Sequence, residues 1–199
     1  MQITPQANIV HAHQNPFAGV DLDTVEQIIV PRFDVDDLVQ KIRQAESLVV
    51  AFEGKKGRGK TTHLALLHQK LPECPFFKLN SDANVQSILS HPSPIVLIDS
   101  IHHLSLSERL AVYKAKKVVI LSRHWRRGWE YRLAKKQVHR IPFKGISLSV
   151  LKSIVEKRLA GTSRSNMMLD DTTLNKLIAK HGDHYRGIIN ELFDQFQTR

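Results

Sequence analysis

The chain contains one cysteine, Cys74, so no disulfide can form within its 199 residues. Proteins without disulfides are typical of reducing compartments. The sequence also lacks any run approaching the ~20 consecutive apolar residues of a membrane-spanning helix. Its first residues contain neither the basic stretch nor the apolar core of a secretory signal. We therefore expect a cytoplasmic protein without a membrane partner.

Several catalytic and metal-binding patterns are absent as well. The histidines have neither paired cysteines nor the H-E-x-x-H spacing of a zinc site. No G-x-S-x-G segment marks the serine of a hydrolase. We expect neither a zinc site nor a serine nucleophile.

Lysine and arginine are missing from the first 31 positions and concentrated later in the chain. The net charge is +10, and the segment Lys114–Lys144 alone holds eleven basic residues and one acid, Glu130. A scattered positive excess would indicate solubility only. A concentrated excess favours a polyanion or a nucleotide phosphate as the partner.

Short apolar runs alternate with helical patterns between residues 31 and 146. This alternation is typical of a parallel sheet with helices on both faces. Residues 147–199 contain helical patterns only, and residues 1–30 are polar and interrupted by two prolines. We predict a flexible arm over 1–30, an α/β core over 31–146 and a helical subdomain over 147–199. The expected strands are Ser47–Phe52, Phe76–Leu79, Ile95–Ile98, Val118–Leu121 and Val138–Pro142.

A phosphate-binding motif follows the first of these strands. The segment Gly54–Thr61 reads GKKGRGKT and fits G-x-x-x-x-G-K-[ST], with a helical pattern directly after it. Glycines let backbone N–H groups turn toward phosphate oxygens, and the helix adds the positive end of its dipole. Lys60 would reach the β- and γ-phosphates, and the Thr61 hydroxyl would bind Mg²⁺. The predicted phosphate-binding residues are Gly54, Gly57, Arg58, Gly59, Lys60, Thr61 and Thr62.

A later strand supports this prediction. The apolar run Pro94–Asp99 ends in a carboxylate, as does the strand that completes the Mg²⁺ site of many P-loop proteins. We predict that Thr61 and Asp99 bind the metal together. The alternative is that Asp99 caps the next turn.

Together these residues resemble the AAA+ superfamily of P-loop ATPases, and more loosely its origin-recognition and transposition-regulator branches. The likeness extends over roughly residues 30–197 and includes the lead-in segment Ile28–Ile42. It implies a three-layer αβα P-loop domain with a C-terminal helical lid, and ATP with Mg²⁺ as the bound cofactors.

The chain departs from this family at the end of the strand that carries Asp99. The resemblance implies a glutamate at the next position, where it polarises the attacking water, but this chain has Ser100. Serine is not a general base near neutral pH without help. Either hydrolysis is slow or another group orients the water, with His102 and His103 as nearby candidates.

The resemblance also implies two polar residues that sense the terminal phosphate. Ser122 or His124 would be the first of them, at the end of the strand that begins at Val118, and both remain open. Arg186 would be the second and would reach the γ-phosphate from the helical lid, unless it is a solvated surface residue. The candidate catalytic residues are Asp99, Ser100, Ser122, His124 and Arg186.

Residues 123–132 mix arginines with three large aromatic side chains. Such a segment can supply an arginine finger to a neighbouring subunit, as the resemblance implies. It can also bind nucleic acid, with cations on phosphates and rings on bases. A solvated basic loop is the third alternative. The candidates for an arginine finger or a DNA contact are Arg123, Arg126, Arg127 and Arg132.

These features lead to one main hypothesis and two alternatives. The main hypothesis is an ATP-dependent switch that hydrolyses ATP slowly and forms a homo-oligomer, as a ring or filament, on DNA rather than RNA. A P-loop small-molecule kinase is the first alternative, although kinases lack such a helical subdomain. The second is a nucleotide-binding scaffold without turnover, which Ser100 favours, acting through a protein partner bound to residues 1–30.

Overall fold

The computed structural model describes residue 17 and residues 25–124, 128–160, 169–182 and 184–197. Contacts within the chain define two compact units, Pro31–Lys144 on the one hand and Met1–Val30 with Gly145–Arg199 on the other. In the described ranges, no helix has both the length and the apolar character needed to cross a membrane.

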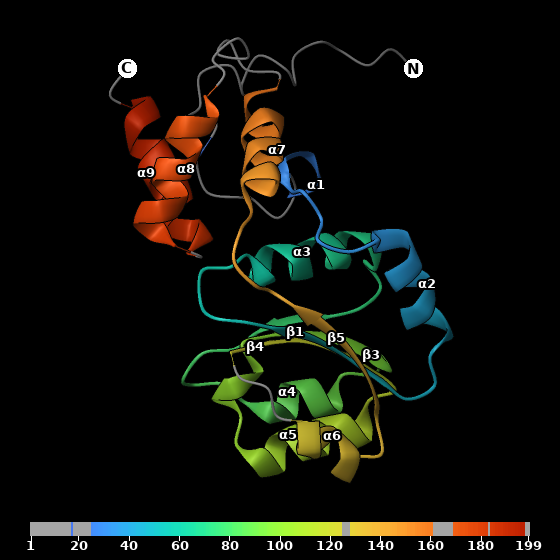
Figure 1. The fold of residues 1–199 in the computed structure, drawn as a ribbon. Coiled ribbons are helices and arrows are strands. Elements are labelled where there is room, and N and C mark those ends of the chain that lie inside the picture. The colour runs from blue at the N-terminus through green and yellow to red at the C-terminus, as the bar shows by residue number, and fades with distance from the viewer. Residues whose placement is uncertain (1–16, 18–24, 125–127, 161–168, 183, 198–199) are drawn as a thin grey trace. The chain divides into compact units, whose positions relative to one another are not determined.

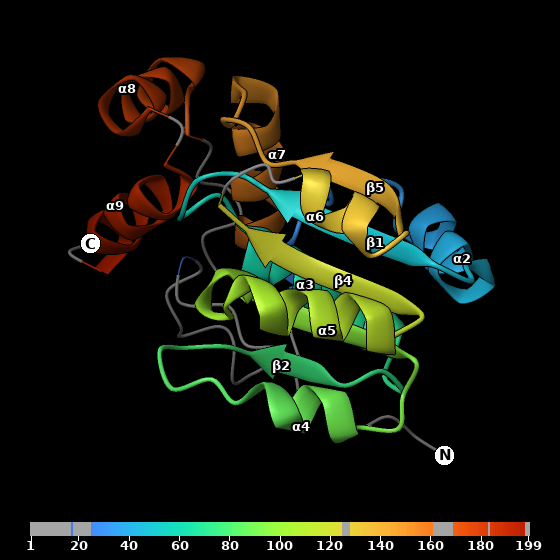
Figure 2. The same cartoon turned by 90° about the horizontal axis from the view of Figure 1, so that it is seen from below.

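The unit Pro31–Lys144 is built on a five-stranded sheet with the strand order β2-β3-β4-β1-β5 (Figures 1 and 2). All strand pairs are parallel. The central strands consist of consecutive apolar residues because both faces of the sheet are covered. The predicted α/β P-loop fold with a parallel sheet is therefore confirmed. The strands are β1 (Leu48–Glu53), β2 (Phe76–Lys78), β3 (Ile95–Asp99), β4 (Val118–Arg123) and β5 (Gln137–Pro142).

Neighbouring side chains of β1 point to opposite faces of the sheet and join two different cores. Val50 and Phe52 belong to the core under α2 and α3, whereas Val49 and Ala51 belong to the core under α4, α5 and α6. The sheet is thus the middle layer of three. The helices are α2 (Val35–Gln44), α3 (Lys60–Lys70), α4 (Val85–Ser90), α5 (Leu106–Ala115) and α6 (Gly128–Leu133).

Local capping residues set the first turns of two of these helices. Asp34 is the N-cap of α2, and its side chain accepts a 3.0 Å hydrogen bond from the Asp37 backbone N–H. Ser105 and Glu108 form a reciprocal capping box at the start of α5. α5 therefore begins directly after a short 3₁₀ turn, Ile101–His103, that follows β3.

The carboxyl ends of the central strands meet at one edge of the sheet because the strands are parallel. β1 ends at Glu53, β3 at Asp99 and β4 at Arg123. Ile98 pairs with Leu121, so the residues that follow them, Asp99 and Ser122, are neighbours across the two strands. Ligands of open α/β sheets bind at this edge.

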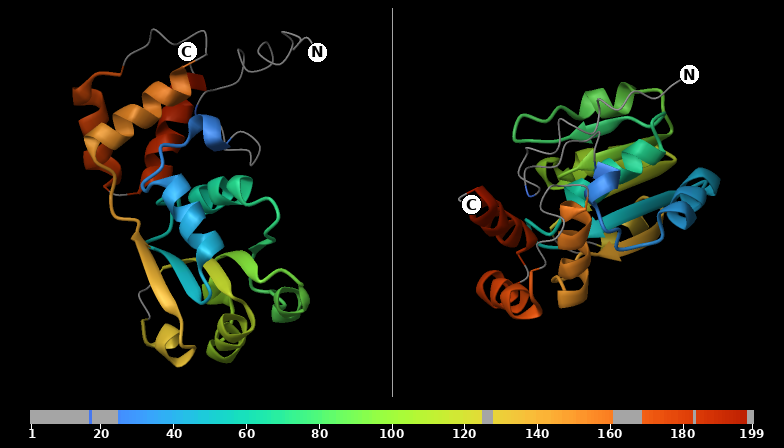
Figure 3. Two further views of the ribbon diagram at one scale, coloured as in Figure 1. Left: turned by 90° about the vertical axis from the view of Figure 1, so that its right-hand side faces the viewer. Right: turned by 90° about the horizontal axis from the view of Figure 1, so that it is seen from above.

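The second unit is helical in its described part (Figure 3). Its helices α7 (Leu148–Leu159), α8 (Asp171–His181) and α9 (Tyr185–Gln197) enclose a core of buried leucine and isoleucine side chains. The predicted C-terminal helices are confirmed. A further short helix, α1 (Val25–Ile28), precedes the sheet unit in the sequence.

The N-terminal segment 1–30, for which a flexible arm stays a prediction, is described at residue 17 and residues 25–30. Phe17, Val25 and Ile29 are buried, and Phe17 belongs to the core of the helical unit. Lys157 of α7 donates hydrogen bonds of 2.9 Å and 2.6 Å to the carbonyl oxygens of Glu26 and Ile29. Apolar residues in a mostly polar segment provide enough buried surface to attach it to the helices. Residues 1–16 and 18–24 lie outside the described part of the chain.

Candidate phosphate-binding site

The loop between β1 and α3 has the backbone geometry that its glycines allow. A side chain at Gly54 would place its Cβ only 2.4 Å from the carbonyl oxygen of Phe143, so only glycine fits there. Gly57 and Gly59 adopt φ angles of 81° and 86°, in the left-handed region that favours glycine. The three glycines therefore let the loop fold over the end of β1 and lead into α3.

Lys60, the first residue of α3, points back into this loop. Its side chain is only 6% exposed, and its Nζ donates hydrogen bonds of 2.6 Å to the Gly54 carbonyl and 2.7 Å to the Lys55 carbonyl. Burial lowers the pKa of Lys60 to about 8, against the opposing effect of Asp99 and with a further lowering by Arg58. The buried Lys60 ammonium donates these hydrogen bonds to uncharged carbonyl oxygens. A negatively charged phosphate oxygen would accept a stronger hydrogen bond from it.

The carboxylate of Asp99 accepts hydrogen bonds from two hydroxyl groups on neighbouring elements. Thr61 Oγ1 donates a 2.9 Å hydrogen bond to one carboxylate oxygen, Oδ2. Ser122 Oγ donates to the other oxygen, Oδ1, and itself accepts a 2.8 Å hydrogen bond from the Ser100 backbone N–H. Asp99 is only 3% exposed. The structure thus joins Thr61, Asp99 and Ser122, three residues that the sequence predicted for the site.

The donor set at Thr61 and Asp99 fits Mg²⁺. A hydroxyl oxygen and a carboxylate oxygen 2.9 Å apart are hard ligands of the kind that this ion prefers. When bound, Mg²⁺ would neutralise charge that develops on the β- and γ-phosphates. Thr61 and Asp99 would then hold the metal while Lys60 contacts the same phosphates.

Ser100 lies at the position where the resemblance implies a glutamate. Its backbone is in the left-handed region, with a φ angle of 64°, which few residues other than glycine adopt. It begins the turn that carries His102 and His103. The backbone of Ser100 therefore turns the chain after β3. A serine hydroxyl is not a general base near neutral pH, so it cannot take the role of a carboxylate.

Three histidine rings lie beside this turn. The ring of His102 is 4.5 Å from that of His103 and 4.5 Å from that of His124, measured between centroids. His124 Nδ1 is 3.4 Å from the carbonyl oxygen of Gly54. The pKa of His102 is lowered to about 4, first by partial burial and then by the neighbouring imidazoles. His102 is therefore neutral at physiological pH.

The remaining predicted phosphate ligands lie around the loop. Arg58 Nη1 donates a 2.8 Å hydrogen bond to the carbonyl oxygen of Phe143, which joins the loop to the segment after β5. Thr62 lies in the first turn of α3 and is partly exposed. His63 was not predicted for this site, and its ring lies 4.8 Å from that of Phe143 and 5.6 Å from that of Phe33. Aromatic rings contributed by separate segments thus adjoin the loop.

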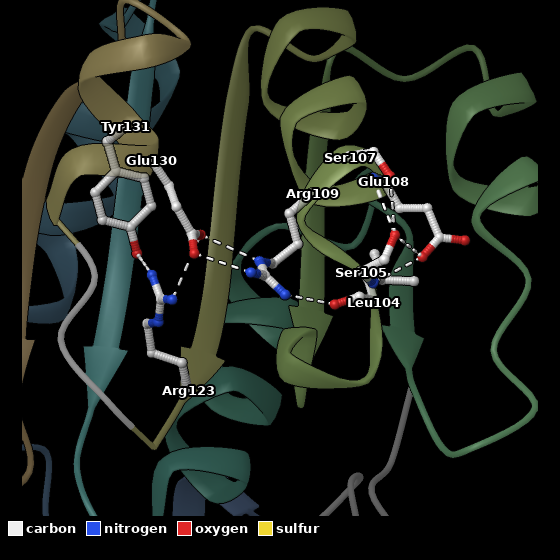
Figure 4. A network of polar contacts seen from close by, with 8 residues as sticks. All are labelled: Leu104, Ser105, Ser107, Glu108, Arg109, Arg123, Glu130 and Tyr131. Carbon is white, nitrogen blue, oxygen red and sulfur yellow. Dashed lines mark hydrogen bonds and ion pairs between the residues drawn. The ribbon is translucent and has the colours of Figure 1, made fainter.

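Arg123 is buried, although the sequence offered it as an arginine finger or DNA contact. Its guanidinium donates a 2.5 Å hydrogen bond to the Tyr131 hydroxyl and contacts Glu130 at 3.5 Å (Figure 4). Glu130 also accepts two hydrogen bonds from Arg109 of α5, at 2.9 Å and 3.1 Å. Arg123 is 4% exposed, so in this structure it joins β4 to α6 and cannot reach another molecule.

Other basic residues of the segment Lys114–Lys144 also serve the fold. Lys116 and Lys136 donate to backbone carbonyl groups, and Arg140 forms a 2.9 Å ion pair with Glu53. The concentration of charge in the sequence therefore overstates the charge available to a polyanion. Side chains that remain exposed are those of Lys114, Arg132, Lys135 and Lys144.

One face of α6 combines a cation with two exposed apolar side chains. Trp129 is 51% exposed and Leu133 is 58% exposed, with exposed Arg132 between them at helical spacing. The opposite face carries Glu130 and Tyr131, which are both fully buried. We name Trp129, Arg132 and Leu133 the α6 face. The candidates Arg126 and Arg127 lie outside the described residues.

Arg186, the predicted sensor of the γ-phosphate, belongs to the helical unit. It lies in the first turn of α9, and its side chain is exposed. An exposed arginine is compatible with the predicted role and with the alternative of a solvated surface residue. Its contact with a nucleotide stays a prediction.

Comparison with known proteins identifies the fold. No protein-family model matches the sequence, and no curated protein matches it. Solved structures do match, among them RuvB of Thermotoga maritima, a Holliday junction branch migration motor, with a TM-score of 0.56 and 16% identity. That match covers 82% of this chain and 61% of the other.

Two further structures agree with this match. AMPPCP-bound DnaA from Aquifex aeolicus has a TM-score of 0.53 and 14% identity, over 82% of this chain and 62% of the other. A DNA replication initiation factor has a TM-score of 0.57 and 15% identity, over 87% of this chain and 64% of the other. The chain therefore has the fold of AAA+ ATPases, as its sequence predicts, and spans less than two thirds of these structures.

Proposed function

We propose that this chain binds ATP with Mg²⁺ and acts as a nucleotide-dependent switch that hydrolyses ATP slowly. The observation that supports this most directly is the convergence of Lys60, Thr61 and Asp99 on one edge of the sheet. An ammonium for the phosphates and two oxygen ligands for the metal are the parts that P-loop ATPases use. The AAA+ fold makes ATP the expected nucleotide.

Slow hydrolysis follows from the group that is missing next to Asp99. Ser100 has no carboxylate. The two carboxylate oxygens of Asp99 already accept hydrogen bonds from the hydroxyl groups of Thr61 and Ser122. A protein that keeps ATP bound for long can hold one conformation for that time and change to another after hydrolysis. Arg186 would report this change to the helical unit, as the resemblance implies.

DNA and a homo-oligomer are the partners that we propose for this switch. Two of the structurally similar proteins are a Holliday junction branch migration motor and a DNA replication initiation factor. The α6 face adds an exposed aromatic ring and an exposed cation, which suit stacking and phosphate contact. Arg132 on this face is also a candidate arginine finger toward a neighbouring subunit.

Steady-state ATP hydrolysis at low salt, measured with and without double-stranded DNA, tests this proposal. Particle size is followed by light scattering in the same samples. We expect slow turnover that DNA accelerates, and ATP-dependent growth in size. Turnover that neither DNA nor protein concentration changes would contradict the assembling switch.

A nucleotide-binding scaffold without turnover is the second candidate, and Ser100 is the observation that favours it. Such a protein would bind Mg-ATP tightly through the same residues and leave it intact. Its effect would then pass to a protein partner, for which residues 1–30 are the proposed binding segment. Tight binding of ATP without hydrolysis over a long incubation separates this candidate from the switch.

A further inference from the structure

Two imidazoles lie at the edge of the phosphate site where the family carboxylate is missing. His124 Nδ1 is 3.4 Å from the Gly54 carbonyl oxygen, which also accepts the hydrogen bond from Lys60 Nζ at 2.6 Å. His124 is therefore beside the ammonium that would hold the phosphates. The ring of His102 contacts that of His124 in a tilted arrangement, with 4.5 Å between centroids and 51° between the ring planes.

Charged groups of the phosphate site influence the protonation of His102. Its protonation is opposed by Lys60 and by the imidazoles of His103 and His124, and favoured by Asp99. These groups come from α3, from the turn after β3, from the end of β4 and from β3 itself. The protonation of His102 is thus influenced by Lys60, which would bind phosphate, and by Asp99, which would bind the metal.

The imidazoles are not arranged to hold a metal ion of their own. In the part of the chain that the structure describes, no group of three or more histidine, cysteine, aspartate or glutamate side chains has a metal-binding arrangement. The side chain of His102 is exposed. A neutral imidazole at an exposed position keeps a ring nitrogen that can accept a hydrogen bond from water.

We propose that His102, supported by its ring contact with His124, positions the water that attacks the γ-phosphate. This inference rests on the proposed ATP hydrolysis and gives it the group that Ser100 lacks. The water oxygen forms a bond to the γ-phosphorus, and the bond from that phosphorus to the bridging oxygen breaks. The electron pair of that bond stays on the β-phosphate of ADP. The imidazole orients the water by accepting a hydrogen bond from it, and the water proton passes to solvent.

Substitution of His102 by alanine, with His103→Ala as the matched control, tests this assignment. Both histidines are exposed and lie in the same short turn, and His102 is the one whose ring contacts His124. We expect His102→Ala to lower the turnover number by about tenfold or more, a modest part of the effect of a general base. Its KM for ATP should stay unchanged, and His103→Ala should lower the turnover number by much less than His102→Ala.

Two further measurements separate positioning of water from a structural role. Free imidazole in the buffer should restore turnover to His102→Ala, because it fills the space left by the ring. The same variant should bind ADP with aluminium fluoride, which imitates the transferred phosphoryl group, about tenfold more weakly while its affinity for ADP alone is unchanged. This second readout does not depend on turnover.

A double variant tests whether His102 takes the role of the glutamate that the chain lacks at Ser100. Ser100→Glu should make His102 dispensable, so that adding His102→Ala to Ser100→Glu costs little turnover. Equal turnover of His102→Ala and the natural protein, or an equal loss in His103→Ala, would overturn the inference. Failure of the natural protein to bind Mg-ATP would instead overturn the proposed function, and the inference with it.

Discussion

Thr61 donates a 2.9 Å hydrogen bond to Asp99, although the two residues are 38 positions apart in the sequence. The contact joins the first turn of α3 to the end of β3 and closes the site between them. It brings a hydroxyl and a carboxylate close enough together for one Mg²⁺ ion to bind both. The proposed ATP site depends on this pair together with Lys60.

Lys60→Ala should weaken Mg-ATP binding by roughly tenfold to a hundredfold, the range for losing hydrogen bonds to a charged group. The matched control is Lys56→Ala, because Lys56 lies in the same loop and is exposed. Fluorescence titration with a labelled ATP analogue measures both. Equal affinities in the two variants would remove Lys60 from the site.

Ser100→Glu should raise the rate of ATP hydrolysis, because it supplies the water-orienting carboxylate that the AAA+ resemblance implies at this position. Ser100 already has a φ angle of 64°, and serine and glutamate both carry a Cβ, so we expect the exchange to change stability little. Steady-state phosphate release measures the rate. Ser100→Gln, with the same size and no charge, is the control, and equal rates in both variants would show that a missing base does not limit turnover.

Glu130→Gln should lower the free energy of unfolding by about 3–5 kcal/mol, because it leaves the buried cations Arg109 and Arg123 without their counter-charge. Glu130 is fully buried between them. Urea denaturation followed by circular dichroism measures the loss. Glu46→Gln removes the exposed partner of Lys117 and should cost far less. Similar losses in the two variants would contradict a structural role for the Arg109–Glu130–Arg123 network.

Trp129→Ala and Arg132→Gln should each weaken DNA binding by about tenfold, through lost stacking in the first variant and a lost phosphate contact in the second. Arg132→Gln should also reduce the dependence of affinity on salt. Lys114→Gln is the control, because Lys114 is an exposed lysine at the carboxyl end of α5 and is not part of the α6 face. An equal effect of all three variants would indicate nonspecific attraction to the positive charge of the chain.

Cys74 should react slowly with iodoacetamide in the native protein at pH 8. Burial raises the pKa of its thiol to about 11, with Glu73 adding to the shift and Arg43 opposing it. Few thiolates are therefore present, and the thiol becomes reactive on unfolding, where its pKa is ordinary. Because the thiol ionises more easily in the unfolded chain, its contribution to stability falls as pH rises from about 9 to about 11. Rapid labelling of the native protein would contradict its place in the core.

The phosphate site was predictable because its signals are local. Gly54–Thr61 follows a strand and precedes a helix, and Asp99 ends an apolar run, so short stretches of sequence specify both. The contact between them follows from parallel strands that end at one edge. The AAA+ fold was predictable for the same reason.

The role of the basic segment was not predictable from the sequence. Arg123 and Arg132 have similar neighbours in the chain, yet one is buried against Glu130 and the other is exposed. Burial of an arginine depends on an acid from another element, and periodicity does not reveal that pairing. Helix α6 was also missed, because its mixture of cations and aromatic residues lacks a clear apolar face.

Mg-ATP binding to the natural protein, measured by isothermal titration calorimetry with Mg²⁺ and again with EDTA, is the most direct test of the account. We predict saturable binding of one ATP per chain that weakens strongly when Mg²⁺ is removed. Such a result would establish the site formed by Lys60, Thr61 and Asp99. Absence of binding, or binding that is the same with and without Mg²⁺, would contradict it.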